Sequence, residues 1–271
     1  VELTELEGAA GADPTGFVIN GVAADDQSAI SVSGAGDVNG DGLDDLIVGA
    51  MGADPNGSLS GASYVVFGKA DGAAVELSAV ELNAGAVPTG FIIKGISTDD
   101  FSGRSVSGAG DVNGDGLDDL IIGAMGTDNS RDVDGDGDDD LTSGSGSSFV
   151  VYGKTGGEAV ELSLVASSVG GFVINGVDAD DQSGRSVSGA GDVNGDGFAD
   201  LIVGAPFDDP NGNSYSGASF VVFGGNFTES VTHVGTSAAE TITGTTSDDI
   251  IYAGGGTDTI TATAGNDRLL G

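Results

Sequence analysis

The sequence predicts an all-β protein built from tandem units, and three observations lead to this prediction. Runs rich in Val, Ile and Phe are short and alternate with clusters of Gly, Asn, Asp and Ser, as strands alternate with turns. No window of eleven residues has the apolar spacing of an amphipathic helix. The same runs also recur three times in one order, so we expect three four-stranded units.

The units occupy residues 1–74, 75–159 and 160–227. Each contains a VEL segment, a GFVIN-type strand, an SVSGAG segment, an Asp-rich loop, an LIVGA or LIIGA strand and a final VVFG or VVYG strand. LIVGA is apolar throughout, which predicts a strand covered on both faces. FVING and SYVVFG alternate more, which predicts strands with one buried face.

The Asp-rich loop, DVNGDGLDD or DVNGDGFAD, is the main candidate site. Oxygen-bearing side chains stand at loop positions 1, 3, 5 and 9, and glycines at positions 4 and 6 allow a tight curl. Ca²⁺ takes about six to eight oxygen ligands in irregular geometry, so we expect these side chains and the carbonyl of position 7 to bind it. The predicted ligands are Asp37, Asn39, Asp41, Leu43 and Asp45; Asp111, Asn113, Asp115, Leu117 and Asp119; and Asp192, Asn194, Asp196, Phe198 and Asp200.

Two other interpretations of the loop are less consistent with the sequence. An acidic, glycine-rich surface turn that binds no ion would share the composition, but four copies with one spacing disfavour it. An EF-hand needs Glu at position 12 and flanking helices, whereas position 12 is Val48, Ile122 or Val203 and each loop runs into a strand pattern.

A fourth copy, DVDGDGDDD, is inserted in the second unit between LIIGA and SSFVVYG. Its ligand spacing predicts a further calcium site made of Asp132, Asp134, Asp136, Asp140 and the carbonyl of Asp138. Because its setting does not repeat that of the other loops, a solvated acidic excursion is the alternative.

Charge and composition restrict the function. Lys and Arg number 7 against 43 Asp and Glu, for a net charge of −36, which excludes a nucleic-acid-binding surface and disfavours anionic membranes. Such a charge favours surroundings rich in cations or salt, which points outside the cell. The chain has no cysteine and no apolar run of the roughly 18 residues that a membrane span needs.

Catalytic chemistry is not indicated. His233 is the one histidine and has no patterned partner, so neither a serine hydrolase nor a zinc hydrolase is expected. Arg104 and Arg185 follow paired aspartates, and we expect them to form structural ion pairs with these. We therefore predict a protein that is not an enzyme.

The order VVFG, calcium-type loop, then LIVGA(M/P) resembles the FG-GAP repeat of integrin α-subunit β-propellers and their bacterial relatives. The resemblance covers residues 1–227, with GAP itself at Gly204 to Pro206 and Met51 or Met125 where the family has proline. It implies one four-stranded blade per unit, calcium in a hairpin loop on one face of the propeller, and ligand recognition by loops of the other face.

The number of blades stays open. A spare strand, Phe17 to Gly21, precedes the first loop, while the third unit has no such strand after it. The spare strand could close the last blade or belong to an upstream blade, and two chains could pair to give about six blades. We expect part of a larger or paired propeller, with a truncated propeller favoured because Val1 begins in mid-repeat.

The pattern changes after residue 227. Acidic residues recur every ninth position at Glu240, Asp249, Asp258 and Asp267, each two places before Ile or Leu. This resembles the RTX nonapeptide of parallel β-rolls, which implies calcium binding by Asp258 and Asp267 and type I secretion. We assign 228–234 to a linker and 235–271 to the start of a roll, with a Thr/Gly-rich linker as the alternative.

These observations predict a secreted or cell-surface bacterial protein that binds Ca²⁺ and mediates adhesion or extracellular matrix contact. The expected partner is an extracellular protein or glycan, or a second copy in a homo-oligomer. One alternative is a structural subunit of a calcium-dependent filament, sheath or surface layer. Another is an ancillary domain of a larger secreted hydrolase.

Overall fold

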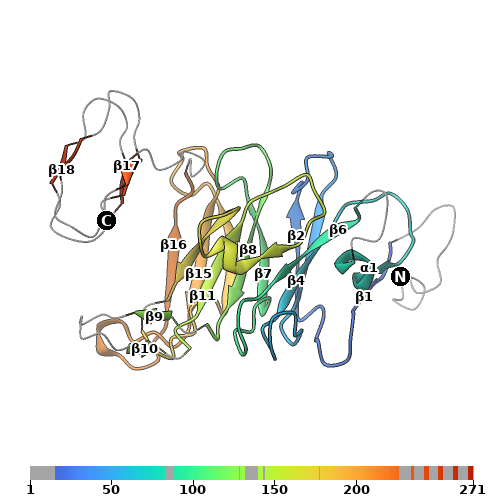
Figure 1. Cartoon of the computed structure of the whole chain (residues 1–271), viewed down its shortest axis with the longest axis horizontal. Helices are drawn as coiled ribbons and strands as arrows, with labels where there is room; N and C mark the ends of the chain where they lie inside the picture. Colours follow the sequence, from blue (N-terminus) through green and yellow to red (C-terminus); the bar gives the residue numbers. More distant parts are fainter. Residues whose placement is uncertain are drawn as a thin grey trace. The chain divides into compact units, whose positions relative to one another are not determined.

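The computed structural model describes residues 16–82, 88–127, 129–131, 140–142, 144–176 and 178–225, and the short strands β17 to β21 beyond them. The chain divides into two compact units, Val1–Gly225 and Asn226–Gly271. Within the first unit, antiparallel blades stand side by side in a row (Figure 1). No helix of this described part is long and apolar enough to cross a bilayer.

The first blade consists of β2 (Ser31–Gly36), β3 (Asp45–Ala50), β4 (Ala62–Val66) and β6 (Gly90–Lys94). The pairs β2·β3, β3·β4 and β4·β6 are antiparallel. Because β6 belongs to the second sequence repeat, this blade combines three strands of one repeat with one strand of the next. The sequence repeat and the blade are therefore offset by one strand.

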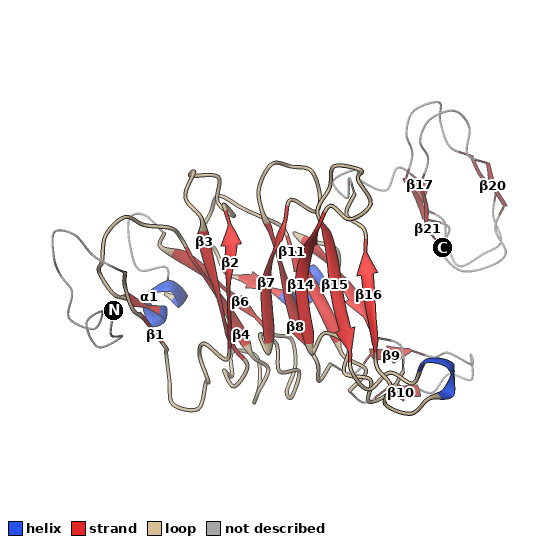
Figure 2. Ribbon diagram, turned by 180° about the vertical axis from the view of Figure 1, so that it is seen from behind, coloured by secondary structure: helices blue, strands red, loops and turns tan. Residues whose placement is uncertain are grey.

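The second blade repeats this arrangement with β7 (Ser105–Gly110), β8 (Asp119–Ala124), β11 (Ser147–Val151) and β13 (Gly171–Asn175). The third contains β14 (Ser186–Gly191), β15 (Asp200–Ala205) and β16 (Ala218–Val222). In the described residues the sheet of the third blade has no strand beyond β16 (Figure 2). The short 3-10 helix η2 (Pro210–Gly212) lies between β15 and β16.

Short elements join successive blades. β12 (Val160–Glu161) pairs in parallel with β6, and β5 (Val75–Glu76) pairs in parallel with β1 (Ile19–Asn20). The helices α1 (Leu77–Glu81) and α2 (Leu162–Val165) follow β5 and β12. Each helix buries two apolar residues three positions apart, but one turn is too short to show a periodic pattern in the sequence.

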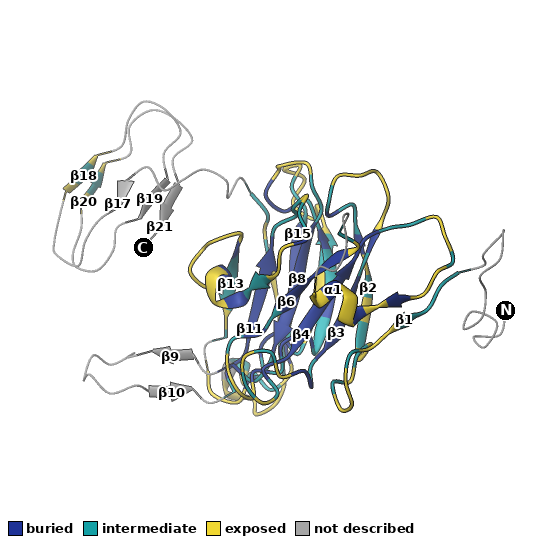
Figure 3. Ribbon diagram, turned by 45° about the vertical axis from the view of Figure 1, so that its right-hand side comes forward, coloured by how far each residue is buried: buried dark blue, intermediate teal, exposed yellow. Residues whose placement is uncertain are grey.

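The core lies between the blades (Figure 3). Every residue of β8 is buried, and β3 has only one half-buried residue, which confirms for these two strands the prediction that LIVGA and LIIGA are covered on both faces. The prediction fails for β15 of the third blade, where Ile202 is 36% exposed. The prediction of one-sided burial for SYVVFG is wrong for β4 and β11, which are buried throughout. The serines of these strands are small and pack between neighbouring blades, so a polar residue in the sequence did not indicate an exposed face.

The second unit contains two short parallel ladders. One joins β17 (His233–Val234), β19 (Ile250–Tyr252) and β21 (Arg268–Leu270), and the other joins β18 (Thr241–Thr243) and β20 (Thr259–Thr261). Parallel stacking is what the nine-residue period predicts. β17 lies in the segment that the sequence assigned to a linker, because a two-residue strand leaves no period to detect.

Candidate calcium loops

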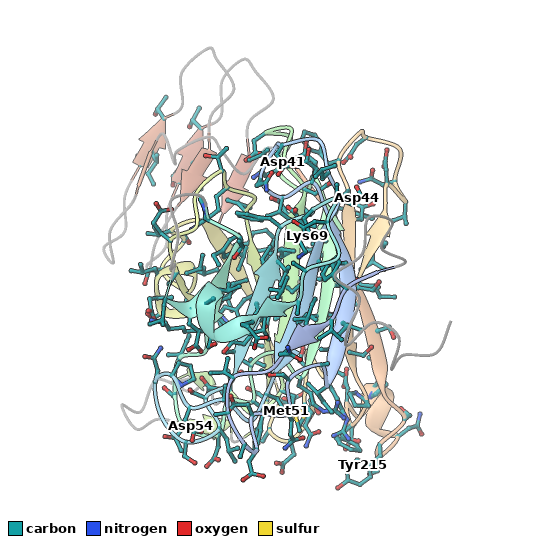
Figure 4. The ribbon with its side chains drawn as sticks, turned by 90° about the vertical axis from the view of Figure 1, so that its right-hand side faces the viewer. Asp41, Asp44, Met51, Asp54, Lys69 and Tyr215 are labelled. Carbon is teal, nitrogen blue, oxygen red and sulfur yellow. The ribbon has the colours of Figure 1, made fainter. Side chains whose placement is uncertain are left out.

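The three Asp-rich loops connect the first and second strands of the three blades. They span residues 37–44, 111–118 and 192–199. In the first blade, Asp41 and Asp44 lie at one end of the strands, whereas Met51 and Asp54 lie at the opposite end (Figure 4). We call these the loop end and the opposite end of the blades.

Side-chain bonds to the backbone hold the first loop. The Asp37 carboxylate accepts hydrogen bonds from the N–H groups of Gly40 at 2.8 Å, Asp41 at 3.0 Å and Gly42 at 2.9 Å. Both glycines have positive φ, at 77° and 89°, which side chains rarely adopt. Asp41 N–H donates to Asn39 Oδ1, and Leu43 N–H donates to Asp41 Oδ1.

The same set of bonds recurs in the loops that begin at Asp111 and Asp192. Three copies thus share one conformation that is fixed by their own side chains. These bonds supply part of the order that a bound ion would otherwise have to impose on each loop.

The aspartate at loop position 9 points into the protein. Asp45, Asp119 and Asp200 are all 0% exposed. Asp45 Oδ2 accepts a hydrogen bond from Val38 N–H at 3.0 Å, and its Oδ1 accepts one from Gly68 N–H at 2.8 Å. The other two aspartates make the equivalent pairs of bonds. Each carboxylate therefore ties its loop to the end of the third strand of the blade.

Burial raises the pKa of two of these carboxyl groups, those of Asp119 and Asp45. It raises the pKa of Asp119 to about 7 against the opposing effect of the Gly153 and Val112 N–H groups, and the neighbouring carboxylates Asp115 and Asp111 raise it further. Burial likewise raises the pKa of Asp45. A cation at the loop would favour the ionised form, because it would offset both the burial and the repulsion.

The donor chemistry of the loops suits Ca²⁺. Carboxylates, an amide oxygen and a main-chain carbonyl are hard oxygen ligands, and a carboxylate that accepts N–H bonds keeps further lone pairs for an ion. In the described residues no group of three or more acidic, His or Cys side chains is gathered as a metal cluster. Asn39 Nδ2 donates to Asp41 Oδ2 at 3.0 Å, so an entering ion must displace this contact.

Successive loops also brace one another. Asp118 Oδ2 accepts a hydrogen bond from Asp37 N–H at 2.8 Å, and Asp118 N–H donates to the Asp37 carbonyl at 3.2 Å. Between the second and third loops only the main-chain bond remains, from Ala199 N–H to the Asp111 carbonyl at 3.0 Å. The sequence did not reveal this role of Asp118. Its only signal was the difference at loop position 8, where the third loop has Ala199 in place of aspartate.

Other predicted site residues lie outside the described part of the chain. These are Asp132, Asp134, Asp136, Asp138, the side chain of Asp140, Asp258 and Asp267. The strands β9 (Asn129–Arg131) and β10 (Asp140–Thr142) pair antiparallel on either side of the inserted copy. The inserted copy thus joins two antiparallel strands, as the other three loops do, although its sequence setting differs.

The predicted ion pairs of the two arginines are not found. In the part of the chain that the structure describes, neither Arg104 nor Arg185 makes an ion pair. Arg185 donates to Gln182 Oε1 and lies 5.4 Å from the ring centre of Phe207. The aspartates before them instead cap turns, as Asp100 Oδ2 does for Ser97 N–H at 2.7 Å.

The fold and loops define a class: an all-β repeat protein whose blades carry acidic loops at one end. The FG-GAP repeat family matches residues 29–66, 102–131 and 183–222, and the RTX calcium-binding nonapeptide repeat family matches residues 234–269. The chain thus contains FG-GAP repeats followed by a segment of RTX repeats. Both are non-catalytic, calcium-binding repeats, and RTX repeats indicate a secreted protein.

Individual relatives agree with this assignment. Integrin alpha-PS2 of Drosophila melanogaster is 33% identical over 123 residues, which are 45% of this chain and 8% of that protein. Integrin alpha pat-2 of Caenorhabditis elegans and that of Caenorhabditis briggsae are each 36% identical over 100 residues, or 37% of this chain and 7% of theirs. The chain therefore spans only a small part of the length of these relatives.

Proposed function

We propose that this protein is a calcium-dependent adhesion or matrix-contact protein of the bacterial exterior, secreted by a type I system. The observation that carries the proposal is the set of three loops with one conformation, joined from blade to blade. Calcium bound there would stiffen the whole row of blades rather than single loops. The expected ligands are those predicted at loop positions 1, 3, 5, 7 and 9.

The opposite end of the blades offers a surface for a protein or glycan ligand. Tyr215 is 72% exposed there and packs edge to face on Phe207, with ring centres 5.8 Å apart (Figure 4). Exposed aromatic side chains held by a neighbour provide contact area at low entropic cost. Binding energy would then come from this end, and calcium would act through the rigidity of the scaffold.

Binding to immobilised matrix proteins and glycans, in calcium and in EGTA, tests the proposal. Calcium should be required for binding, and Asp37→Asn should weaken it by removing a carboxylate from one loop. Asp25→Asn is a charge-matched control on an exposed turn outside the loops. Tyr215→Ala should weaken binding without changing calcium affinity. Equal binding in calcium and EGTA would refute the calcium dependence.

A second candidate function is a structural subunit of a calcium-dependent extracellular filament or layer. Two observations on the described residues favour it: no strand pairs with the outer edge of β16, and Val32 on the outer face of β2 is 63% exposed. Sedimentation of the protein with and without calcium tests this candidate, because a calcium-dependent filament or layer must assemble in calcium and dissociate in EGTA.

A further inference from the structure

The third blade has an uncovered apolar edge. Phe220 and Val221 of β16 are 47% and 49% exposed, and Phe223 just after it is 55% exposed. The equivalent residues of the first blade are at most 8% exposed. The difference arises because β6 pairs with β4, and β13 with β11, while in the described residues no strand pairs with the outer edge of β16.

A strand with the sequence for this edge occurs elsewhere in the chain. Residues 16–20 read GFVIN, which is identical to β13, and Gly21 follows as Gly176 follows β13. The first glycine of β13, Gly171, has φ 153°, and a Cβ there would lie 1.9 Å from the Val150 carbonyl oxygen. A Cβ on Gly176 would lie 2.1 Å from the Ser145 carbonyl oxygen. These glycines let the strand approach its neighbour, and segment 16–21 keeps both.

In the described part of the chain, segment 16–20 pairs with a strand on only one side. Ile19 and Asn20 pair in parallel with β5, and Lys69 Nζ lies 4.7 Å from the ring centre of Phe17. β6 makes the same contacts on one side, with β12 and with Lys154 over Phe91 at 4.7 Å. On its other side β6 pairs with β4. Segment 16–20 could therefore accept an antiparallel neighbour without leaving β5.

The loop end of the first blade carries a matching polar group. Asp118 caps the N–H of Asp37 in the preceding blade. Asp44 holds the same position in the first loop, and among the described residues its carboxylate accepts no hydrogen bond. It is placed to cap the first aspartate of a loop in a preceding blade. The first blade thus carries a strand and a capping carboxylate that match the uncovered edge and the loop of the third blade.

We propose that β16 of one copy takes up residues 16–20 of a second copy. The β11·β13 register then predicts the pairs Ala218 with Asn20, Phe220 with Val18, and Val222 with Gly16. Phe17 would meet Phe223, as Phe91 meets Phe67 with ring centres 6.0 Å apart. Asp44 would cap Asp192 N–H. The junction between copies repeats the junction between the first and second blades.

The geometry favours a second copy over the same copy. β1 and β16 lie at opposite ends of the row of blades, so the strand of one molecule does not reach its own β16 as arranged (Figure 1). A head-to-tail junction uses different surfaces on the two partners and leaves one of each free, so association can continue. This inference does not depend on the proposed adhesive function.

One residue should weaken the junction. Gly103 and Gly184 sit where a Cβ would lie 2.3 Å from the carbonyl oxygens of Ala62 and Ser147 in the preceding blade. The first blade has Ala29 at this position, with φ 71°. Its methyl group would press on the third blade of the neighbouring copy. Association should therefore be reversible, and Ala29→Gly should strengthen it by roughly tenfold.

Sedimentation velocity of the full chain in millimolar calcium tests the proposal. The average mass should rise with protein concentration. Gly16→Val, in the donor strand, and Val221→Lys, on the acceptor edge, should each abolish this rise. Asp44→Ala should weaken association by roughly tenfold. Circular dichroism of each variant should match the parent, because the altered positions are exposed or peripheral in a single copy.

Mixing the two non-associating variants provides the decisive measurement. Gly16→Val keeps an intact acceptor edge and Val221→Lys keeps an intact donor strand, so an equimolar mixture should form dimers that do not grow further. A parent that stays monomeric at all concentrations would overturn the proposal, and so would a mixture that remains monomeric. Ligand binding by monomeric Gly16→Val tests the adhesive function separately.

Discussion

Removal of calcium should make the stability of the blades fall as the pH rises through neutrality. The cause is the buried aspartate at loop position 9. Asp119 has an ordinary pKa of 3.8, and burial raises it to about 7 in the folded chain. Between these values the folded state holds a proton that the unfolded state has released. Raising the pH then forces ionisation of a buried carboxyl group and favours unfolding.

The magnitude follows from the size of this shift. Each pKa unit corresponds to about 1.36 kcal/mol, so a shift of about three units is worth about 4 kcal/mol over the full titration. Between about pH 5 and about pH 7.5 the expected loss is roughly 2 to 3 kcal/mol from Asp119 alone. This is a large share of the roughly 5 to 15 kcal/mol that stabilises a typical domain. Asp45, with its pKa also raised by burial, adds to the effect.

Urea unfolding followed by circular dichroism, in EGTA at constant ionic strength, measures the effect. Bound calcium should remove the loss, because its field lowers the pKa of the carboxyl group. Asp119→Asn should reduce the pH dependence in EGTA, with the contribution of Asp45 remaining, whereas Asp25→Asn should leave it unchanged. Stability that stays constant or increases with pH in EGTA would show that the buried aspartates are not protonated as inferred.

Three further predictions concern single residues. Asp118→Ala should lower the free energy of unfolding by about 1.5 to 3 kcal/mol, because the hydrogen bond to Asp37 is lost. Asp44→Ala should change the free energy of unfolding by less than about 0.5 kcal/mol in dilute protein. Equal effects of the two substitutions in urea unfolding would contradict the assigned role of Asp118. Gly103→Ala should cost about 1 to 3 kcal/mol because its Cβ would meet the Ala62 carbonyl, and an unchanged melting temperature would count against it. Asp37→Asn should bind one calcium ion fewer than the parent in calorimetric titration, and an equal stoichiometry would exclude its loop as a site.

Much of the fold follows from local pattern. The strands β3 and β8 are runs of apolar residues, and the glycines and aspartates between the runs mark the turns. The offset between repeat and blade could also be anticipated, because the GFVIN strand stands before the loop of its own repeat. The two short helices were not visible, since a single turn with two buried residues has no period.

The contacts between blades were less accessible to sequence reasoning. The complete burial of β4 and β11 depends on small side chains such as Ser63 and Ser147, whose polarity suggested an exposed face. The inward direction of Asp45 depends on the N–H of Gly68, which is distant in the sequence. Arg185 was expected to pair with an aspartate, but its neighbours in space are Gln182 and Phe207. Such contacts depend on how consecutive blades meet, which no single repeat encodes.

The one-strand offset between repeat and blade limits how this protein could gain or lose length. If a duplicated segment ended at VVFG, the last blade before it would lose the fourth strand that its own following repeat supplied. The inserted copy would supply an equivalent strand to that blade. Gain or loss of whole units would therefore leave every sheet within the row complete. Recombination within such a gene would alter molecular length without requiring new contacts between units.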